Sequence, residues 1–271
     1  MSLTMTLQEA ADHLGAHYMT VYRYVRLGRL PARKVAGVWE VDLADVVALQ
    51  EDKENPTAAR KSADWTGRLE VRLLEGDEAG AWGVVEGALA SGASPNEIYL
   101  DVLGPALVSI GDKWVDGSVS VAREHLATAV ALRLIGRLGP RFARRGRAKG
   151  TVLVTTPPGE RHFIPSLIVS DLLRGAGLQV IDLGADVPAE SLAGIVAEVD
   201  GVVAVCVSTT RSGADPAIRR SLKAVRSAKP DLPVFVGGNS IADADHAAAL
   251  GADGWAKDGS GVVDLVLSQL A

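Results

Sequence analysis

The residues best suited to chemistry in this 271-residue sequence are Glu160 and His162. They follow a short apolar run rich in Val and Thr at 151–156, and an apolar-periodic segment begins at residue 163, which is the pattern of a strand, a loop and a helix. In an open α/β sheet, ligands bind beyond the carboxyl ends of the strands, where this loop lies. A carboxylate that holds one nitrogen of an imidazole raises the basicity of the other. The plainer alternative is that His162 only caps the helix.

The elements that position this pair alternate regularly through the C-terminal domain, residues 150–271. Such alternation predicts a parallel sheet covered by helices on both faces, a flavodoxin-like, Rossmann-type α/β fold with strand order 2-1-3-4-5. The expected strands lie at 151–156, 179–183, 201–208, 233–237 and 253–256, and the expected helices at 163–174, 188–198, 215–228, 241–249 and 260–270.

Two further motifs lie downstream of the Glu-x-His pair at long, regular spacing. After Pro165 there are 42 residues to Ser208-Thr209-Thr210, and then 26 residues to Gly237-Gly238. This spacing resembles the cobalamin-binding domains of the methionine synthase and mutase type. The resemblance implies that the His162 imidazole replaces the base of the cofactor as lower cobalt ligand. It also implies a supporting carboxylate and a slot for the displaced nucleotide tail, formed by Glu160, Ser208, Thr210, Gly237 and Gly238.

The motif departs from that family at two positions. Glu160 stands where the family has Asp, which lengthens the side chain by one methylene but keeps the carboxylate. Pro165 stands where the family has Gly, and a proline is well accommodated in the first turn of a helix. We therefore expect a retained site, and the alternative is a loop that no longer holds cobalamin with its own base displaced.

A helical segment at 65–140 precedes this domain and predicts a four-helix bundle, with helices expected at 65–75, 77–90, 96–114 and 119–137. Within it, Trp114 is followed by nine residues and then by Glu124 and His125. The sequence resembles the CarH and LitR family of light-responsive MerR-type repressors, in which such a bundle caps the upper face of adenosylcobalamin. In that family a histidine after the tryptophan becomes the upper ligand following illumination, whereas this chain has Val115. We therefore expect the light response to be absent, or to use another ligand such as His125 or water.

The N-terminal residues 1–50 predict a DNA-binding domain. A helix begins at Thr6 with Glu9 as its capping-box partner, and a second helix follows over 17–26. A short hairpin at 33–35 and 38–41 comes next, so that the segment resembles the excisionase-like branch of the MerR helix-turn-helix superfamily, with a winged fold. The residues expected to contact double-stranded DNA lie on one face of the second helix or are basic residues of the wing, namely Thr20, Arg23, Arg26, Arg33 and Lys34.

Two charged segments join these domains. Residues 51–64 contain a proline and lack large apolar side chains, which predicts a linker. Residues 141–149, RFARRGRAK, carry five basic side chains, and the sequence leaves open an exposed linker or a second DNA contact.

Composition limits the class of protein. Hydrophobic residues make up 48% of the chain, no apolar run approaches the length of a membrane span, and no signal peptide is visible, so we expect a cytoplasmic protein. The single cysteine, Cys206, lies in an apolar run and is expected to be buried and inert.

These features together predict a cobalamin-binding, DNA-binding transcriptional regulator, a repressor without catalytic activity. Adenosylcobalamin or another cobalamin would control whether the protein is a homo-oligomer, as a dimer or tetramer, and so its affinity for operator DNA. Two alternatives stay open: a regulator of the same fold that senses another ligand or lacks the photoresponse, and a corrinoid protein that carries methyl groups. The DNA-reading segment argues against the second alternative, because a methyl carrier does not need it.

Overall fold

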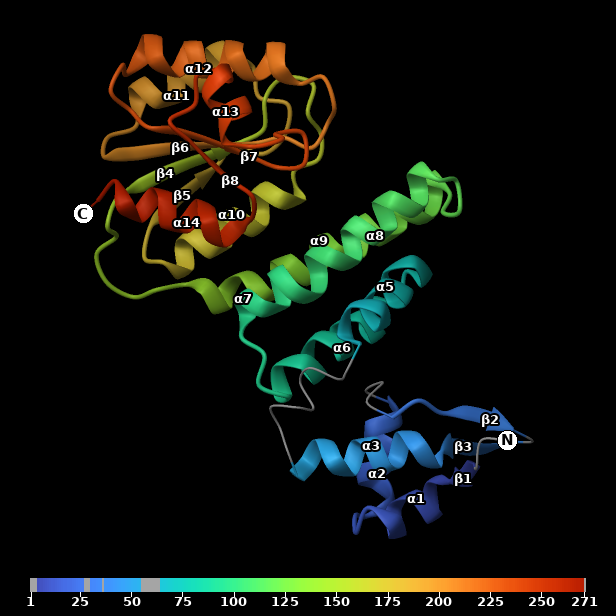
Figure 1. Cartoon of the computed structure of the whole chain (residues 1–271). Helices are drawn as coiled ribbons and strands as arrows, with labels where there is room; N and C mark the ends of the chain where they lie inside the picture. The colour runs from blue at the N-terminus through green and yellow to red at the C-terminus, as the bar shows by residue number, and fades with distance from the viewer. Residues whose placement is uncertain (1–3, 27–29, 36, 55–63, 271) are drawn as a thin grey trace. The chain divides into compact units, whose positions relative to one another are not determined.

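The computed structural model describes residues 4–26, 30–35, 37–54 and 64–270 (Figure 1). It divides into two compact units, residues 1–134 and 135–271, which are described separately below. Most of the linker expected at 51–64 lies outside the described residues.

The N-terminal segment is a small helical domain with a three-stranded antiparallel sheet in the order β1-β3-β2. The side chain of Thr6 accepts from the Glu9 N–H and the Glu9 carboxylate accepts from the Thr6 N–H, which confirms the capping box. Strand β1 pairs with β3 and was not expected from the sequence. The elements are β1 (Thr4–Thr6), α1 (Leu7–His13), α2 (Tyr18–Arg26), β2 (Arg33–Val35), β3 (Val38–Asp42) and α3 (Leu43–Glu54).

The next segment is helical, as expected, and each of its first three helices has a side-chain cap at its N-terminus. Asp64, Asp77 and Ser94 accept hydrogen bonds from backbone N–H groups of the helices that follow them. The elements are α5 (Trp65–Glu75), α6 (Glu78–Ala90), α7 (Pro95–Glu97), the π-helical turn η1 (Ile98–Leu103), α8 (Gly104–Val115) and α9 (Val121–Leu138).

The continuous helix expected at 96–114 is interrupted by η1, which corrects the sequence prediction. Pro105 has no N–H to donate to the Asp101 carbonyl, so the regular α-helical ladder cannot continue through this point. That carbonyl instead accepts from the hydroxyl of Thr66 at 3.0 Å, and the Gly104 N–H reaches back to Tyr99 in a π-helical bond.

The C-terminal unit is the predicted five-stranded parallel sheet. Its strand order, β5-β4-β6-β7-β8, is the expected 2-1-3-4-5 order. The unit begins with the last turn of α9 and the 3-10 turn η2 (Gly139–Phe142). Its strands are β4 (Thr151–Thr155), β5 (Gln179–Asp182), β6 (Val202–Ser208), β7 (Val234–Gly237) and β8 (Gly254–Ala256), and its helices are α10 (Ile164–Gly175), α11 (Ala189–Glu198), α12 (Asp215–Ala228), α13 (Ala244–Leu250) and α14 (Gly259–Ser268).

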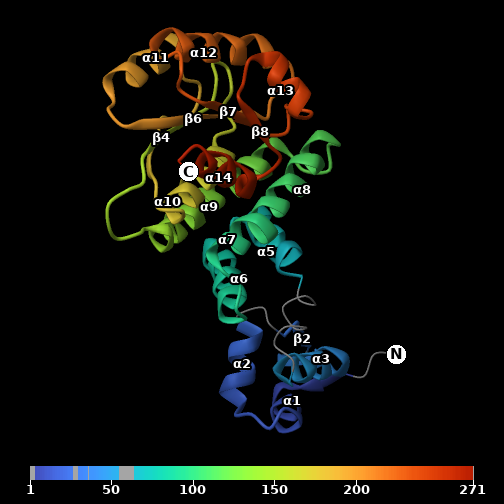
Figure 2. The same cartoon turned by 60° about the vertical axis from the view of Figure 1, so that its left-hand side comes forward.

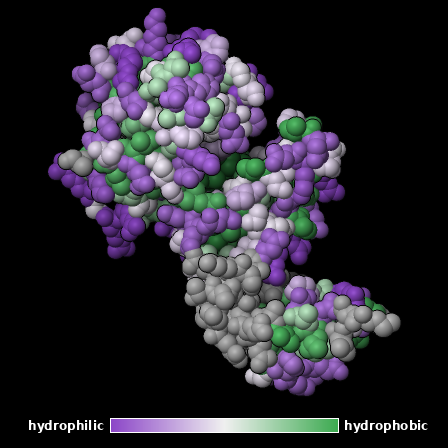
Figure 3. All heavy atoms as spheres, viewed as in Figure 1, coloured by the Kyte–Doolittle hydropathy of each residue, from purple (hydrophilic) through white to green (hydrophobic). Residues whose placement is uncertain are grey.

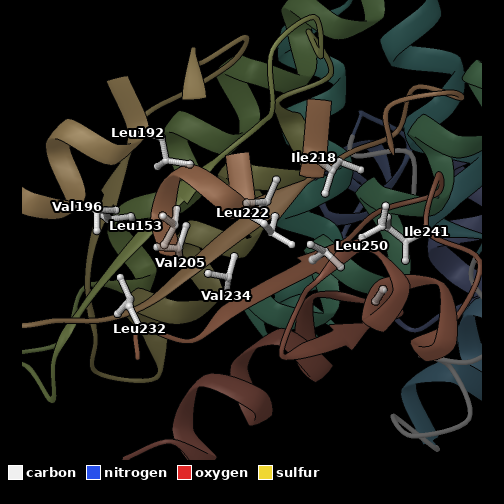
Figure 4. Close-up of a cluster of buried hydrophobic side chains, with 14 of the residues drawn as sticks. Leu153, Leu192, Val196, Val205, Ile218, Leu222, Leu232, Val234, Ile241 and Leu250 are labelled. Atoms are coloured by element: carbon white, nitrogen blue, oxygen red, sulfur yellow. The ribbon is translucent and has the colours of Figure 1, made fainter. Parts of the chain in front are cut away.

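Two apolar layers enclose this sheet. Helices α11, α12 and α13 cover one face, and α10 and α14 cover the other (Figures 1 and 2). Side chains of β4 alternate between the layers: Leu153 joins the cluster drawn in Figure 4, and Val152 and Val154 join the opposite one. Cys206 is buried in the second cluster, as expected, and burial raises the pKa of its thiol to about 12. The sheet is thus a rigid base for the loops at its carboxyl edge.

The basic segment at 141–149 precedes β4 and therefore lies at the amino end of this strand, opposite to the loop that carries His162. Phe142 is buried against Gly175, and the Arg144 guanidinium donates to the Gly175 carbonyl at 2.7 Å, which satisfies the carboxyl end of α10. All residues of the segment except Phe142 are exposed.

The surface of the α8–α9 turn is partly apolar. Val115 and Val121 are exposed there, and hydrophobic spheres are visible at the tip of this hairpin in Figure 3. No helix among the described residues is both long enough and apolar enough to cross a membrane.

Candidate functional site

Glu160 and His162 meet in the loop after β4, as the sequence predicted. Glu160 is fully buried, and its Oε1 accepts from the His162 backbone N–H at 2.9 Å and lies 2.6 Å from His162 Nδ1. The His162 side chain remains 58% exposed, and its Nε2 has no hydrogen bond to any described residue. The imidazole is therefore fixed through one nitrogen, and the other is free to bind a ligand.

The second carboxylate oxygen of Glu160 is held by the loop after β6. Oε2 accepts from the backbone N–H groups of Thr210 and Arg211, each at 2.7 Å, and from the Thr209 hydroxyl at 3.4 Å. Burial raises the pKa of the Glu160 carboxyl, but the N–H donors of His162, Arg211 and Thr210 together lower it by more. The pKa of the Glu160 carboxyl is thus below its ordinary value, and the group is a charged carboxylate at neutral pH. It accepts a hydrogen bond from the Nδ1–H group of His162.

Pro165 lies in the first turn of α10, where its missing N–H costs nothing, in agreement with the sequence prediction. No side chain caps this helix at Phe163, and the Ser166 hydroxyl donates to the Phe163 carbonyl at 2.7 Å. His162 is thus not the helix cap, which removes the plainer explanation for a histidine at this position.

The proposed slot residues lie at the carboxyl ends of β6 and β7. Ser208 pairs with Gly237 in the parallel register, and the Thr209 N–H donates to the Gly237 carbonyl at 2.9 Å. Gly238 has φ +102°, and a Cβ at this position would lie 2.1 Å from the Thr209 carbonyl oxygen. Only glycine allows these two loops to approach so closely. Ser208 and Gly238 are both partly exposed at this edge.

The sequence did not predict the residues that hold the His162 loop by hydrogen bonds. Asp186 has the unusual φ of 56°, and its carboxylate accepts from the Gly159 N–H at 2.6 Å. The Thr156 hydroxyl donates to the Glu160 carbonyl at 2.8 Å and accepts from the Asp186 N–H. Arg211 was not predicted either, because it contacts Glu160 through its backbone N–H, which nearly every residue type has.

In the helical segment, Trp114, Glu124 and His125 lie near the α8–α9 turn. Trp114 is 45% exposed although it is a large aromatic side chain, and Val115 beside it is 78% exposed. Glu124 lies 2.5 Å from His125 Nδ1 and also accepts from the Thr128 hydroxyl at 2.9 Å. The exposed indole is a flat surface on which a ligand can pack.

The predicted DNA-contacting residues lie on α2 and the β2–β3 hairpin. Arg23 is exposed and Thr20 is partly exposed, whereas Val21 of the same helix is buried and faces the core. The side chain of Arg26 lies outside the described residues. Arg33 is 3.8 Å from Glu40, and Lys34 lies over the Trp39 ring.

Comparisons with known proteins agree with this geometry. Residues 66–138 and residues 150–264 each match a family model described as a B12 binding domain, and residues 4–54 match a helix-turn-helix domain. The chain therefore carries B12-binding domains behind a helix-turn-helix domain. The C-terminal unit is accordingly called the B12-binding domain below.

Relatives of two kinds share parts of the chain. It is 35% identical to the HTH-type transcriptional repressor CarH of Myxococcus xanthus over 147 residues, which are 53% of this chain and 48% of CarH. It is 29% identical to trimethylamine corrinoid protein 1 of Methanosarcina acetivorans over 73% of this chain and 93% of that protein. The monomethylamine corrinoid protein of Methanosarcina barkeri has the same fold over 74% of this chain and 95% of its own, with a TM-score of 0.66 and 19% identity.

The residues present fit a corrinoid cofactor. One exposed imidazole supported by a buried carboxylate is a donor set for a single axial position, and the described residues include no cluster of three or more His, Cys, Asp or Glu side chains that could hold a metal ion alone. At the ends of β6 and β7, Gly237 and Gly238 carry no side chain, and Gly238 packs closely against the Thr209 backbone.

Proposed function

We propose that this protein is a cobalamin-dependent transcriptional regulator that binds double-stranded DNA and has no catalytic activity. The observation that carries the proposal is the Glu160–His162 pair: Nδ1 is held at 2.6 Å by a buried carboxylate, and Nε2 is exposed. This pair follows a domain that matches helix-turn-helix proteins.

In this proposal His162 would hold the cobalt of the bound cofactor. Its ring orientation is set before the cofactor arrives, because the Glu160 carboxylate is itself fixed by three backbone N–H groups. Ser208, Thr210, Gly237 and Gly238 line the slot for the nucleotide tail that His162 displaces. Pre-organised ligands of this kind lower the entropic cost of binding.

The helical segment would supply the upper cover. Trp114 offers its exposed indole to the upper group of the cofactor, and Glu124 with His125 provides hydrogen-bonding groups on the next helix. Adenosylcobalamin, when bound, supplies a cobalt–carbon bond that light can break. Val115 has no donor atom, so a bis-histidine state with a ligand at this position cannot form. Any photoresponse would need His125 or water, or be absent.

Regulation would act through assembly. A cofactor that binds the assembled form more tightly than the free protomer shifts the equilibrium toward assembly. Several helix-turn-helix domains on one DNA site then multiply the affinity for an operator. The similarity to the repressor CarH supports this reading, with repression as the outcome of DNA binding.

The second candidate is a corrinoid carrier of methyl groups. It is favoured by the match that covers 93% of a trimethylamine corrinoid protein. A carrier makes no use of the exposed Arg23 and Lys34 in a helix-turn-helix domain. Binding to duplex DNA separates the two candidates.

The experiment combines three readings on one sample. The protein is mixed with adenosylcobalamin in the dark, its absorption spectrum and its elution from a sizing column are recorded, and its binding to genomic DNA fragments is measured with and without cofactor. We expect a spectrum with the cofactor's base displaced, a cofactor-dependent change in assembly, and tighter binding to a subset of fragments. Cofactor uptake without any effect on DNA binding would reject a regulator and favour the carrier.

A further inference from the structure

A second histidine of the B12-binding domain, His246, joins the loop after β6, which also holds Glu160, to the loop after β7. His246 Nε2 lies 3.1 Å from Asp215 Oδ2, which opens α12 after the β6 loop. Its other ring nitrogen, Nδ1, accepts from the backbone N–H of Ala242 in the β7–α13 loop at 3.2 Å. One imidazole thus bridges the segments that follow β6 and β7.

The two contacts define the tautomer. Because the Ala242 N–H needs a lone pair on Nδ1, the ring proton resides on Nε2 and is donated to the Asp215 carboxylate. The His246 backbone N–H also donates to Asp243 at 2.8 Å, which starts α13. His246 therefore has a fixed position and uses both ring nitrogens for structure, unlike His162.

The same two loops meet a second time nearer the sheet. Ser240 Oγ lies 3.1 Å from the Thr209 hydroxyl, and a Cβ on Gly238 would contact Thr209. Ile218 of α12 and Ile241 of the β7–α13 loop also belong to one buried cluster (Figure 4). The contact between the loops is thus tied at the sheet by Ser240 and Thr209 and farther along by His246 and Asp215.

We infer that the His246–Asp215 bridge is a positioning device that fixes the spacing of the two loops and thereby pre-forms the slot for the nucleotide tail of cobalamin. This inference rests on the proposed function, in which Ser208 and Gly238 line that slot. His246 and Asp215 act through the loops and need not touch the cofactor.

The physical reason is the cost of ordering loops on binding. A loop that is already held in its bound conformation gives up less entropy when the ligand arrives, so loss of the bridge weakens binding. Loss of the bridge weakens the binding of only that part of the cofactor that enters the slot. The support of His162 stays in place, because the part of the β6 loop that holds Glu160 is tied to the sheet separately by the hydrogen bond from the Thr209 N–H to the Gly237 carbonyl. A corrinoid that lacks the nucleotide tail therefore does not depend on the bridge.

The test uses two matched substitutions of His246 in the full chain. His246→Asn keeps an acceptor near the Nδ1 position for the Ala242 N–H but is too short to reach Asp215. His246→Gln keeps a donor near the Nε2 position and can still reach Asp215. Each variant, with Asp215→Ala, is titrated with cobalamin and with cobinamide, which has the corrin ring but no nucleotide tail.

We expect His246→Asn and Asp215→Ala to weaken cobalamin binding about five- to tenfold, which lies within the range of one ordinary intramolecular hydrogen bond. His246→Gln should stay within about twofold of the parent protein, and cobinamide affinity should be unchanged in all variants.

Three results would overturn the inference: undiminished cobalamin binding by His246→Asn, equal losses for both corrinoids, or equal losses for the Asn and Gln variants. These results differ from failure of the proposed function, which would appear as a parent protein that binds neither corrinoid. Thermal unfolding of each variant confirms that the fold is intact.

Discussion

Glu160 Oε1 lies 2.6 Å from His162 Nδ1, and this contact joins a fully buried carboxylate to a half-exposed imidazole. The carboxylate is anchored by the loop after β6, fifty residues further along the chain. The orientation of His162 therefore depends on the folded sheet and not on its own loop alone. Several consequences of this arrangement can be measured.

Substitution of Glu160 should weaken cofactor binding without abolishing it. Glu160→Gln keeps an acceptor near His162 but loses the charge that supports the imidazole, so we expect cobalamin affinity to fall about 10- to 100-fold. The measurement is a spectroscopic titration of the full chain. Glu190→Gln, on the exposed side of α11, is the matched control and should bind like the parent protein. Equal affinity of both variants would remove Glu160 from the site.

Gly238 should be far less tolerant of alanine than another glycine with the same backbone conformation. Gly238 and Gly251 have φ of +102° and +96°, but only a Cβ on Gly238 meets other atoms. Both alanine variants bear the cost of positive φ, about 1–2 kcal/mol. Gly238→Ala should lose about 1–3 kcal/mol more through overpacking. Chemical denaturation of the cofactor-free protein measures the difference, and equal losses would contradict the close approach of the two loops.

Cys206 should be unreactive in the folded protein. Burial raises the pKa of its thiol to about 12, and only the thiolate attacks alkylating reagents. At pH 8 the protein should therefore resist labelling, and reactivity should appear when it is unfolded by denaturant. Mass spectrometry of the labelled protein gives the rate. Fast labelling under native conditions would show that β6 is not enclosed as described.

The helix-turn-helix domain should bind DNA through phosphate contacts of α2. Arg23→Ala removes one exposed cation, so we expect weaker binding to duplex DNA and a salt-dependence slope that falls by about 0.9. Fluorescence anisotropy at several salt concentrations measures both. Lys223→Ala, which removes an exposed cation from α12, should leave both quantities unchanged. An unchanged slope for Arg23→Ala would exclude this residue from the DNA interface.

The sequence predicted most of the B12-binding domain because its signals are local. Alternating apolar strands and periodic helices fix the layers, and the strand order followed from the fold class. The interruption at 98–103 had a local signal in Pro105 that the sequence prediction did not use. The Thr66 hydroxyl that satisfies the Asp101 carbonyl was not predictable, because it reaches this turn from a different helix. Strand β1 was missed because three residues carry too little pattern to separate a strand from a loop.

The residues of the candidate site that act through their side chains could be predicted from the sequence, and those that act through backbone groups could not. Glu160, His162 and Gly238 stand out by residue type and spacing. The contacts of Thr210 and Arg211 with Glu160 use backbone N–H groups, which any residue could supply. The αL conformation of Asp186 also has no signature in the sequence, because its stabilising bonds to Gly159 and Thr156 form only in the fold.

Binding of the cobalt by His162 can be detected by electron paramagnetic resonance of cob(II)alamin bound to the protein. The protein is produced with nitrogen-15 histidine and loaded with unlabelled cobalamin, and the nitrogen splitting of the axial ligand is recorded. We predict a doublet from labelled histidine, which His162→Ala eliminates. A triplet from the cofactor's own unlabelled base, unchanged in His162→Ala, would show that His162 is not the ligand.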